Sequence, residues 1–408
     1  MIFRGHIDGR PALVSVKDTS ISLAFEAEWI AAWDFGGRLY SLWKRGRTYR
    51  RGLNGRVLSK WHESGSLNPY DARQRLSMEG EAVDAIVQET ADTAGLLNRA
   101  LARDPSAWTN AAGQHPDANV LTLIERCARF DARAAKGDAA RFAEVYSPVG
   151  ILPPDQYLAT VLQATDGCSF GTCTFCDLYH GGYRVKSGDE FRRHAAAVRE
   201  YLGDSASLRG RSFFLGSANA LAVPMGRLVE FFEAIPELFG GRPRPVHAFV
   251  DGFTGLRKTS ADYAELRSKG LGRVYIGLES GHDALLAFVR KPASRAQAVE
   301  AVRTIKAGGA PVGVIVMTGL GGQEFAAGHV RDTIAAVNDM RLGANDLLFF
   351  SDLVEAPGTA YPQTAAAHNI QPLSLDERLA QMAAVRAGLV FEDRPPQVAR
   401  YDVREFVY

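Results

Sequence analysis

Hydrophobic and polar positions divide this chain into two parts with different patterns. Short alternating runs fill the first 60 residues, and Asn54-Gly55 is a strong signal for a hairpin turn. From about Glu79 onward, the apolar positions recur with the spacing of helices. We therefore expect an N-terminal α+β domain over residues 1–146, in which strands come first and helices follow.

A regular alternation begins after the proline-containing segment 147–157. Six almost continuous apolar runs are separated by helical stretches, and these runs are 157–165, 211–216, 245–251, 273–280, 311–320 and 346–354. Apolar strands that alternate with helices form a parallel sheet covered by helices. Six such units predict an α/β fold, a partial (β/α)6 TIM-like barrel over residues 147–392, and we assign residues 393–408 to a C-terminal tail.

Composition and charge narrow the classes of function. The chain has 408 residues, 46% of them hydrophobic, and a formal net charge of +1. Such a charge gives no general attraction to nucleic acid or to a membrane surface. No stretch reaches the roughly 18 apolar residues of a membrane span, and the N-terminal segment lacks the apolar core of a signal peptide. We expect a cytoplasmic protein with no membrane partner, and nucleic acid is not the expected partner.

Three of the four cysteines are clustered. Cys168, Cys173 and Cys176 form a C-x4-C-x2-C segment directly after the first apolar run of the expected barrel. Three thiolates on one loop can hold three irons of a [4Fe–4S] cluster and leave the fourth iron open to a small chelating molecule. The alternative is a zinc site, for which Asp177 or His180 would supply the fourth ligand.

This segment resembles the cluster loop of the radical S-adenosylmethionine (radical SAM) superfamily. Phe175 stands directly before the last cysteine, as an aromatic residue does in that family. The commonest family spacing is C-x3-C-x2-C, and the four intervening residues here resemble a YgiQ-like branch. The resemblance covers roughly residues 150–392. It implies a [4Fe–4S] cluster on the three cysteines and S-adenosylmethionine as the second cofactor.

Two other strand ends extend the resemblance. Residues 213–221 resemble the glycine-rich segment that receives the amino group of S-adenosylmethionine, which implies that Gly216, Ser217 and Asn219 bind the cofactor. Glu279 resembles the polar residue near the ribose or methionine part of the cofactor. Its alternative interpretation is a salt bridge within the barrel.

The remaining candidates lie at neighbouring strand ends. Met317 and Gly319 belong to a segment that resembles the adenine-lining end of the fifth strand. Asp251 ends the third strand and is our candidate catalytic residue, as a proton relay or substrate anchor, whereas the alternative is an aspartate that caps a turn or helix. Lys291 could reach the cofactor carboxylate or could be a surface lysine.

The resemblance also implies a reaction. The cluster and S-adenosylmethionine together yield methionine and a 5′-deoxyadenosyl radical, which abstracts hydrogen from a substrate. That substrate is expected to be a small molecule or a peptide, and a reducing partner such as flavodoxin or ferredoxin is needed. A second cysteine cluster and an Asp-x-His-x-x-Gly cobalamin segment are absent from the sequence, which disfavours the auxiliary-cluster and cobalamin-dependent classes.

A basic stretch between Trp43 and Trp61 leaves a second function open. Its cations are Lys44, Arg45, Arg47, Arg50, Arg51, Arg56 and Lys60. Such a stretch could hold an anionic group, or it could be a solvated face. We expect the N-terminal domain to close the open side of the barrel and to offer this stretch to an anionic substrate. The alternative is a non-catalytic iron–sulfur or zinc module that binds nucleic acid through it.

Overall fold

The computed structural model describes residues 1–26, 28–63, 73–179, 181–356 and 358–408. The chain divides into two compact units. Unit 1 comprises Met1–Pro148, Ala197–Gly210 and Val407–Tyr408, and unit 2 comprises Val149–Ala196 and Arg211–Phe406. Unit 1 thus includes two segments that lie beyond the N-terminal domain expected from the sequence.

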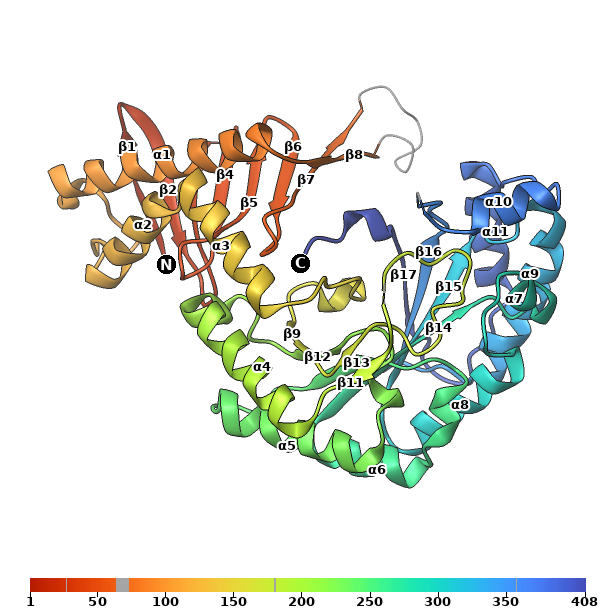
Figure 1. Ribbon diagram of the computed structural model, residues 1–408. Helices are drawn as coiled ribbons and strands as arrows, with labels where there is room; N and C mark the ends of the chain where they lie inside the picture. Colours follow the sequence, from red (N-terminus) through yellow and green to blue (C-terminus); the bar gives the residue numbers. More distant parts are fainter. Residues whose placement is uncertain (27, 64–72, 180, 357) are drawn as a thin grey trace. The chain divides into compact units, whose positions relative to one another are not determined.

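Unit 1 is built on an eight-stranded antiparallel sheet in which every strand pairs with its neighbour in sequence (Figure 1). The strands are β1 Ile2–Ile7, β2 Arg10–Val16, β3 Ile21–Phe25, β4 Trp29–Trp33, β5 Leu39–Lys44, β6 Arg47–Arg51, β7 Val57–His62 and β8 Arg73–Met78. Three helices follow them, namely α1 Glu81–Arg103, α2 Ala118–Arg129 and α3 Ala132–Val145. The expected order of strands first and helices second is confirmed. Asn54 and Gly55 lie in the connection between β6 and β7, where Gly55 has a φ of +81°.

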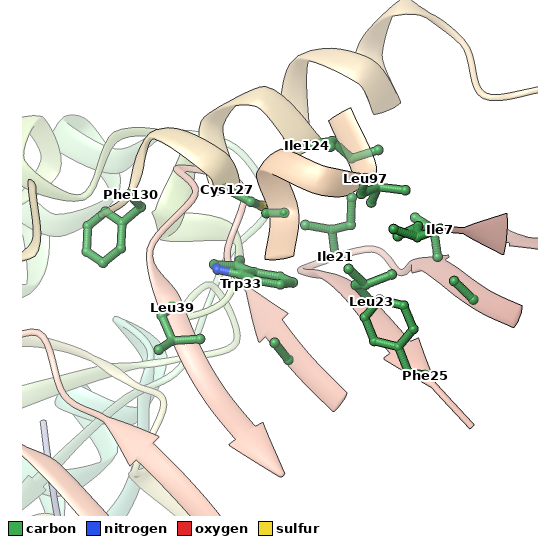
Figure 2. Close-up of a cluster of buried hydrophobic side chains, with 14 of the residues drawn as sticks. Ile7, Ile21, Leu23, Phe25, Trp33, Leu39, Leu97, Ile124, Cys127 and Phe130 are labelled. Carbon is green, nitrogen blue, oxygen red and sulfur yellow. The ribbon is translucent and has the colours of Figure 1, made fainter. Parts of the chain in front are cut away.

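The core of unit 1 lies between the sheet and the helices (Figure 2). Alternate strand residues such as Leu23 and Trp33 are buried, and they pack against Leu97 of α1 and Ile124 of α2. Each large apolar side chain buried in this way contributes roughly 1.5–3 kcal/mol relative to an exposed one. Cys127 is 2% exposed and belongs to this core, so it has a packing role apart from the three clustered cysteines.

Buried charges link α3 to the sheet of unit 1. The Asp138 carboxylate accepts hydrogen bonds from Arg38 Nε at 2.7 Å and from Arg51 Nη2 at 3.2 Å, and all three residues are buried. Lys44 pairs with Glu89 of α1 at 2.8 Å. Two cations of the basic stretch, Lys44 and Arg51, therefore have counter-charges within unit 1. The basic stretch is only partly a solvated face.

We predict that Asp138→Ala lowers the free energy of unfolding by about 3–5 kcal/mol, because it leaves two buried guanidinium groups without their counter-charge. Urea denaturation measures this loss. Glu125→Ala serves as the control, since the Arg129–Glu125 pair is exposed and contributes less than about 1 kcal/mol. An equal loss in both variants would contradict the structural role of Asp138.

Unit 2 contains a seven-stranded parallel sheet in the order β17-β16-β15-β14-β13-β12-β9. The strands are β9 Thr160–Gln163, β12 Phe213–Gly216, β13 Val246–Phe249, β14 Leu271–Glu279, β15 Val312–Thr318, β16 Leu347–Asp352 and β17 Gln397–Tyr401. The six expected strands are confirmed. The seventh, β17, lies in the segment that the sequence assigned to a tail. It has no continuous apolar run because it is an edge strand with β16 as its neighbour in the sheet.

Helices cover the outside of this sheet, as Figure 1 shows for α5, α6 and α8. The helices of this part of the chain are α4 Gly188–Leu202, α5 Met225–Phe239, α6 Ser260–Ser268, α7 Asp283–Phe288, α8 Arg295–Ala307, α9 Gly322–Asp339, α10 Tyr361–Ala367 and α11 Leu375–Ala387. Thr259, Ser294 and Ser374 begin α6, α8 and α11 with capping boxes. Within the described ranges, no helix is long and apolar enough to cross a bilayer.

Candidate active site

The parallel sheet brings the expected site segments to one edge. The cysteine loop follows β9, Gly216 ends β12, Asp251 follows β13, Glu279 ends β14, and Met317 lies at the end of β15. Because parallel strands end on the same side, these segments meet at the carboxyl edge, where α/β barrels carry their chemistry.

A short two-stranded ribbon closes the stem of the cysteine loop. It consists of β10 (Thr165–Asp166) and β11 (Arg184–Val185), which pair antiparallel. The Asp166 carboxylate accepts bonds from Arg184 Nη2 at 2.7 Å and Lys186 Nζ at 2.8 Å. Partial burial acts to raise the pKa of Asp166, but the two cations outweigh it and lower that pKa. The stem is thus held by an ion-paired carboxylate.

Backbone bonds dock the loop onto the segment after α7. Thr174 donates its backbone N–H to Val289 O at 3.0 Å, and Thr172 Oγ1 donates to Arg290 O at 3.1 Å. Phe175 packs against the apolar cluster that contains Val289 and Tyr361. This packing fixes the loop beside its last cysteine, and the cofactor-binding role of Phe175 stays a prediction.

The three cysteines lie close enough to influence one another. Cys168 and Cys173 are half-buried and Cys176 is exposed. Burial raises the pKa of Cys173 to about 11; the charge of Lys291 opposes this rise, whereas the charges of Glu279 and of the other two thiolates add to it. Desolvation by the surrounding protein atoms also raises the pKa of Cys176, although the residue is exposed. A cluster that binds these sulfurs must therefore displace their protons.

The three cysteines provide the ligand set that an iron–sulfur cube needs. In the described part of the chain, no three His, Cys, Asp or Glu side chains are close enough to share one metal ion. A cube binds each thiolate at a different iron, so its ligands need not converge on one point. His180, the candidate zinc ligand, lies outside the described residues. Metal binding by Cys168, Cys173 and Cys176 stays a prediction.

Asn219 joins the cysteine loop to two strand ends. It is 3% exposed, and its amide nitrogen donates to Ser169 Oγ at 2.8 Å, to Thr254 Oγ1 at 3.0 Å and to Asp251 Oδ2. Its amide oxygen accepts from the backbone N–H of Asp251 at 3.1 Å. The side chain therefore positions the loop, and its expected contact with the cofactor stays a prediction.

Asp251 adopts the geometry of the capping alternative. Its Oδ1 accepts the backbone N–H groups of Phe253 at 2.8 Å and Thr254 at 2.7 Å, and its Oδ2 accepts from Thr254 Oγ1 at 2.7 Å. These bonds form a turn directly before the 3₁₀ helix Thr254–Arg257. The carboxylate thus has a structural role at the carboxyl edge, and its catalytic role stays a prediction.

The end of β12 is fastened to the stem of the loop. Gly216 O accepts from the backbone N–H of Ala164 at 2.6 Å, and the N–H of Ser217 donates to Thr165 Oγ1 at 3.0 Å. Gly216 and Ser217 therefore lie directly beside the loop, where the resemblance places the amino group of the cofactor. Their cofactor binding stays a prediction.

Glu279 forms a buried ion pair with Lys291. Its Oε1 accepts from Lys291 Nζ at 3.1 Å, and both side chains are nearly buried. Burial acts to lower the pKa of Lys291, but Glu279 first and the Cys173 thiolate next raise it to about 12. Glu279 therefore forms the salt bridge that was its alternative interpretation. The alternative interpretation of Lys291 as a surface lysine is wrong.

The backbone around Glu279 is irregular. Glu279 has a φ of +60°, and the register between β14 and β15 shifts between Gly277 and Glu279. A Cβ atom on Gly277 would overlap with Glu279 Oε1, so the carboxylate folds back over the glycine. This bulge turns the Glu279 side chain toward Lys291 instead of continuing the strand.

Two histidines that sequence reasoning missed hold the chain directly after Glu279. Ser280 Oγ lies 2.6 Å from His329 Nδ1, and His282 Nδ1 lies 2.6 Å from Asp332 Oδ2. Burial first, and the charge of His282 second, lower the pKa of His329 to about 4, so this ring is neutral at pH 7. The Ser-Gly-His sequence after the strand was the signal that could have indicated this anchoring to α9.

Met317 and Gly319 occupy the end of β15 and the turn after it. Met317 packs against the same apolar cluster as Phe175. Gly319 has a φ of +84°, and its N–H donates to Gln381 Oε1 at 2.8 Å. Their place at the carboxyl edge agrees with an adenine-lining role, which stays a prediction.

Unit 2 is a helix-covered parallel sheet with three cysteines on the loop after its first strand. Residues 162–332 match the family model of the Radical SAM superfamily. This stretch is a radical SAM domain. Members of the superfamily are enzymes that bind a [4Fe–4S] cluster and S-adenosylmethionine. The match does not distinguish the YgiQ-like branch.

Solved structures similar to the chain include three radical SAM or related proteins. Coproporphyrinogen III oxidase from Escherichia coli is 14% identical over 61% of this chain and 54% of that chain, with a TM-score of 0.41. The archaeal Methanocaldococcus infernus Elp3 is 10% identical over 60% of each chain, with a TM-score of 0.40. The cobalamin-dependent S-adenosylmethionine radical enzyme OxsB is 13% identical over 57% of this chain and 31% of that chain, with a TM-score of 0.36.

The chain thus spans less than two thirds of each of these structures. No curated protein matches it. The family assignment rests on the matched family model and not on these similarities.

We predict that replacing Cys168, Cys173 or Cys176 singly by alanine abolishes assembly of the iron–sulfur cluster, because two thiolates do not hold a cube that needs three. Iron and sulfide content after anaerobic reconstitution measures this. Cys127→Ala is the control and should leave the iron content unchanged, since Cys127 lies in the core of unit 1. Full iron content in any of the three loop variants would refute the ligand assignment.

Proposed function

We propose that this radical SAM enzyme cleaves S-adenosylmethionine reductively at a [4Fe–4S] cluster held by Cys168, Cys173 and Cys176. When bound, the cluster and the cofactor supply methionine and a 5′-deoxyadenosyl radical that removes hydrogen from a substrate. The observation that carries the proposal is the position of the three cysteines on one loop at the carboxyl edge of the sheet, near the Glu279–Lys291 pair.

Each group at this edge has a separate task in the proposal. Lys291 places a positive charge near Cys173 and so favours the thiolate that a cluster needs. Glu279 presents a fixed carboxylate to the ribose or methionine part of the cofactor. Gly216 and Ser217 offer a backbone without bulky side chains to its amino group. Asn219 keeps the loop against the ends of β12 and β13.

The proposal includes partners. Radical SAM enzymes need a reductant and a substrate, and we propose flavodoxin or ferredoxin as the electron donor in the cytoplasm. The substrate is a small molecule or peptide, and its anionic part is assigned to exposed cations of the basic stretch, such as Arg45. Unit 1 is proposed as the substrate or lid domain.

We predict that the reconstituted protein, reduced with dithionite, converts S-adenosylmethionine to methionine and 5′-deoxyadenosine. The variant Glu279→Gln should retain its iron, but its rate of 5′-deoxyadenosine formation should fall at least about tenfold. The expected loss follows because a neutral amide removes the charge that orders Lys291 and accepts from the ribose. Chromatography of the products and iron analysis measure the two quantities.

Glu355→Gln is the control, since it changes an exposed carboxylate after β16. A zinc-containing wild type that makes no 5′-deoxyadenosine would refute the proposed function. Full activity of Glu279→Gln would refute only the role of this carboxylate.

A further inference from the structure

Tyr183 buries a hydroxyl group beside the cysteine loop. Its Oη is shielded from solvent and has no hydrogen-bond partner within the described part of the chain. A buried hydroxyl that makes no hydrogen bond costs free energy, so a folded protein rarely keeps one without a use. The residue directly precedes β11, the strand that closes the stem of the loop.

The ribbon directs Tyr183 toward the expected cofactor segment. Val185 pairs with Thr165, whereas Asp166 and Arg184 form the ion pair on the other face. Tyr183 directly precedes β11, and if the alternation of the strand continues by one residue, its side chain is on the face of Val185 and Thr165. On that face, Thr165 Oγ1 accepts the backbone N–H of Ser217.

The electrostatic surroundings agree with this position. Burial first, and then the charges of Cys168 and Asp251, raise the pKa of Tyr183, while Arg257 opposes them. The phenol is therefore protonated at neutral pH and can donate. Asp251 is within electrostatic range, but its carboxylate already accepts from Asn219, Thr254 and Phe253.

We propose that Tyr183 contacts the cofactor, and that its hydroxyl donates a hydrogen bond to an oxygen of S-adenosylmethionine bound at the cluster. The cofactor offers carboxylate and ribose oxygens as acceptors, and Tyr183 lies within electrostatic range of Cys168, the first cysteine of the loop. This inference rests on the proposed function and adds a cofactor-contacting residue to it.

The test is Tyr183→Phe, which removes the hydroxyl and keeps the ring. Equilibrium binding of S-adenosylmethionine to the anaerobically reconstituted protein should weaken about tenfold, equivalent to about 1.4 kcal/mol. Iron content should stay unchanged. Without S-adenosylmethionine, the melting temperature should equal or exceed that of the wild type, because no hydrogen bond is lost.

Tyr201→Phe is the matched control, since it removes another buried hydroxyl, in unit 1 and not beside the cysteine loop. Its affinity for S-adenosylmethionine should equal that of the wild type. Unchanged affinity in Tyr183→Phe, or a lower melting temperature without the cofactor, would overturn the proposal and assign the hydroxyl a structural role. A wild type that binds no S-adenosylmethionine would instead refute the proposed function.

Discussion

The site depends on holding three thiols near one another on a loop that has almost no regular secondary structure. A loop of this kind is fixed only by its attachments, and here the attachments come from several directions. The β10–β11 ribbon closes its stem, Val289 and Arg290 accept its threonine donors, and Asn219 binds Ser169 near its first cysteine. Most of these contacts use backbone groups or short polar side chains, which leave little rotational freedom.

Some charged side chains at the carboxyl edge hold the backbone in place, whereas others remain candidates for binding the cofactor. Asp166 is satisfied by two cations and Asp251 by its own turn, so both carboxylates stabilise the backbone. Glu279 and Lys291 differ from these two carboxylates because they pair with each other at the carboxyl edge. The charge of Lys291 also acts to lower the pKa of Cys173. Breaking a buried ion pair costs free energy. A bound ligand can offset this cost if it forms hydrogen bonds with Glu279 or Lys291 in place of part of their mutual interaction.

The sequence was informative where a pattern follows from local physics. Six apolar runs predicted six strands because buried parallel strands are apolar on both faces, and the cysteine spacing indicated the loop. The edge strand β17 was missed because Gln397 and Arg400 interrupt its apolar residues and none of its five residues is buried. The burial of Lys291 and Arg51 could not be read from their neighbours in sequence, since their partners, Glu279 and Asp138, are distant in the chain. For Asp251, the sequence left the capping and catalytic interpretations open, and only the hydrogen bonds of the folded chain show its capping geometry.

In the proposed function, three cysteines hold a four-iron cluster whose remaining iron is open to S-adenosylmethionine. Mössbauer spectroscopy of the ⁵⁷Fe-reconstituted protein, recorded with and without S-adenosylmethionine, tests it most directly. We predict a [4Fe–4S] spectrum in which about one quarter of the iron signal shifts when S-adenosylmethionine is added. A [4Fe–4S] spectrum that S-adenosylmethionine leaves unchanged, or a protein that retains zinc and no iron, would contradict it.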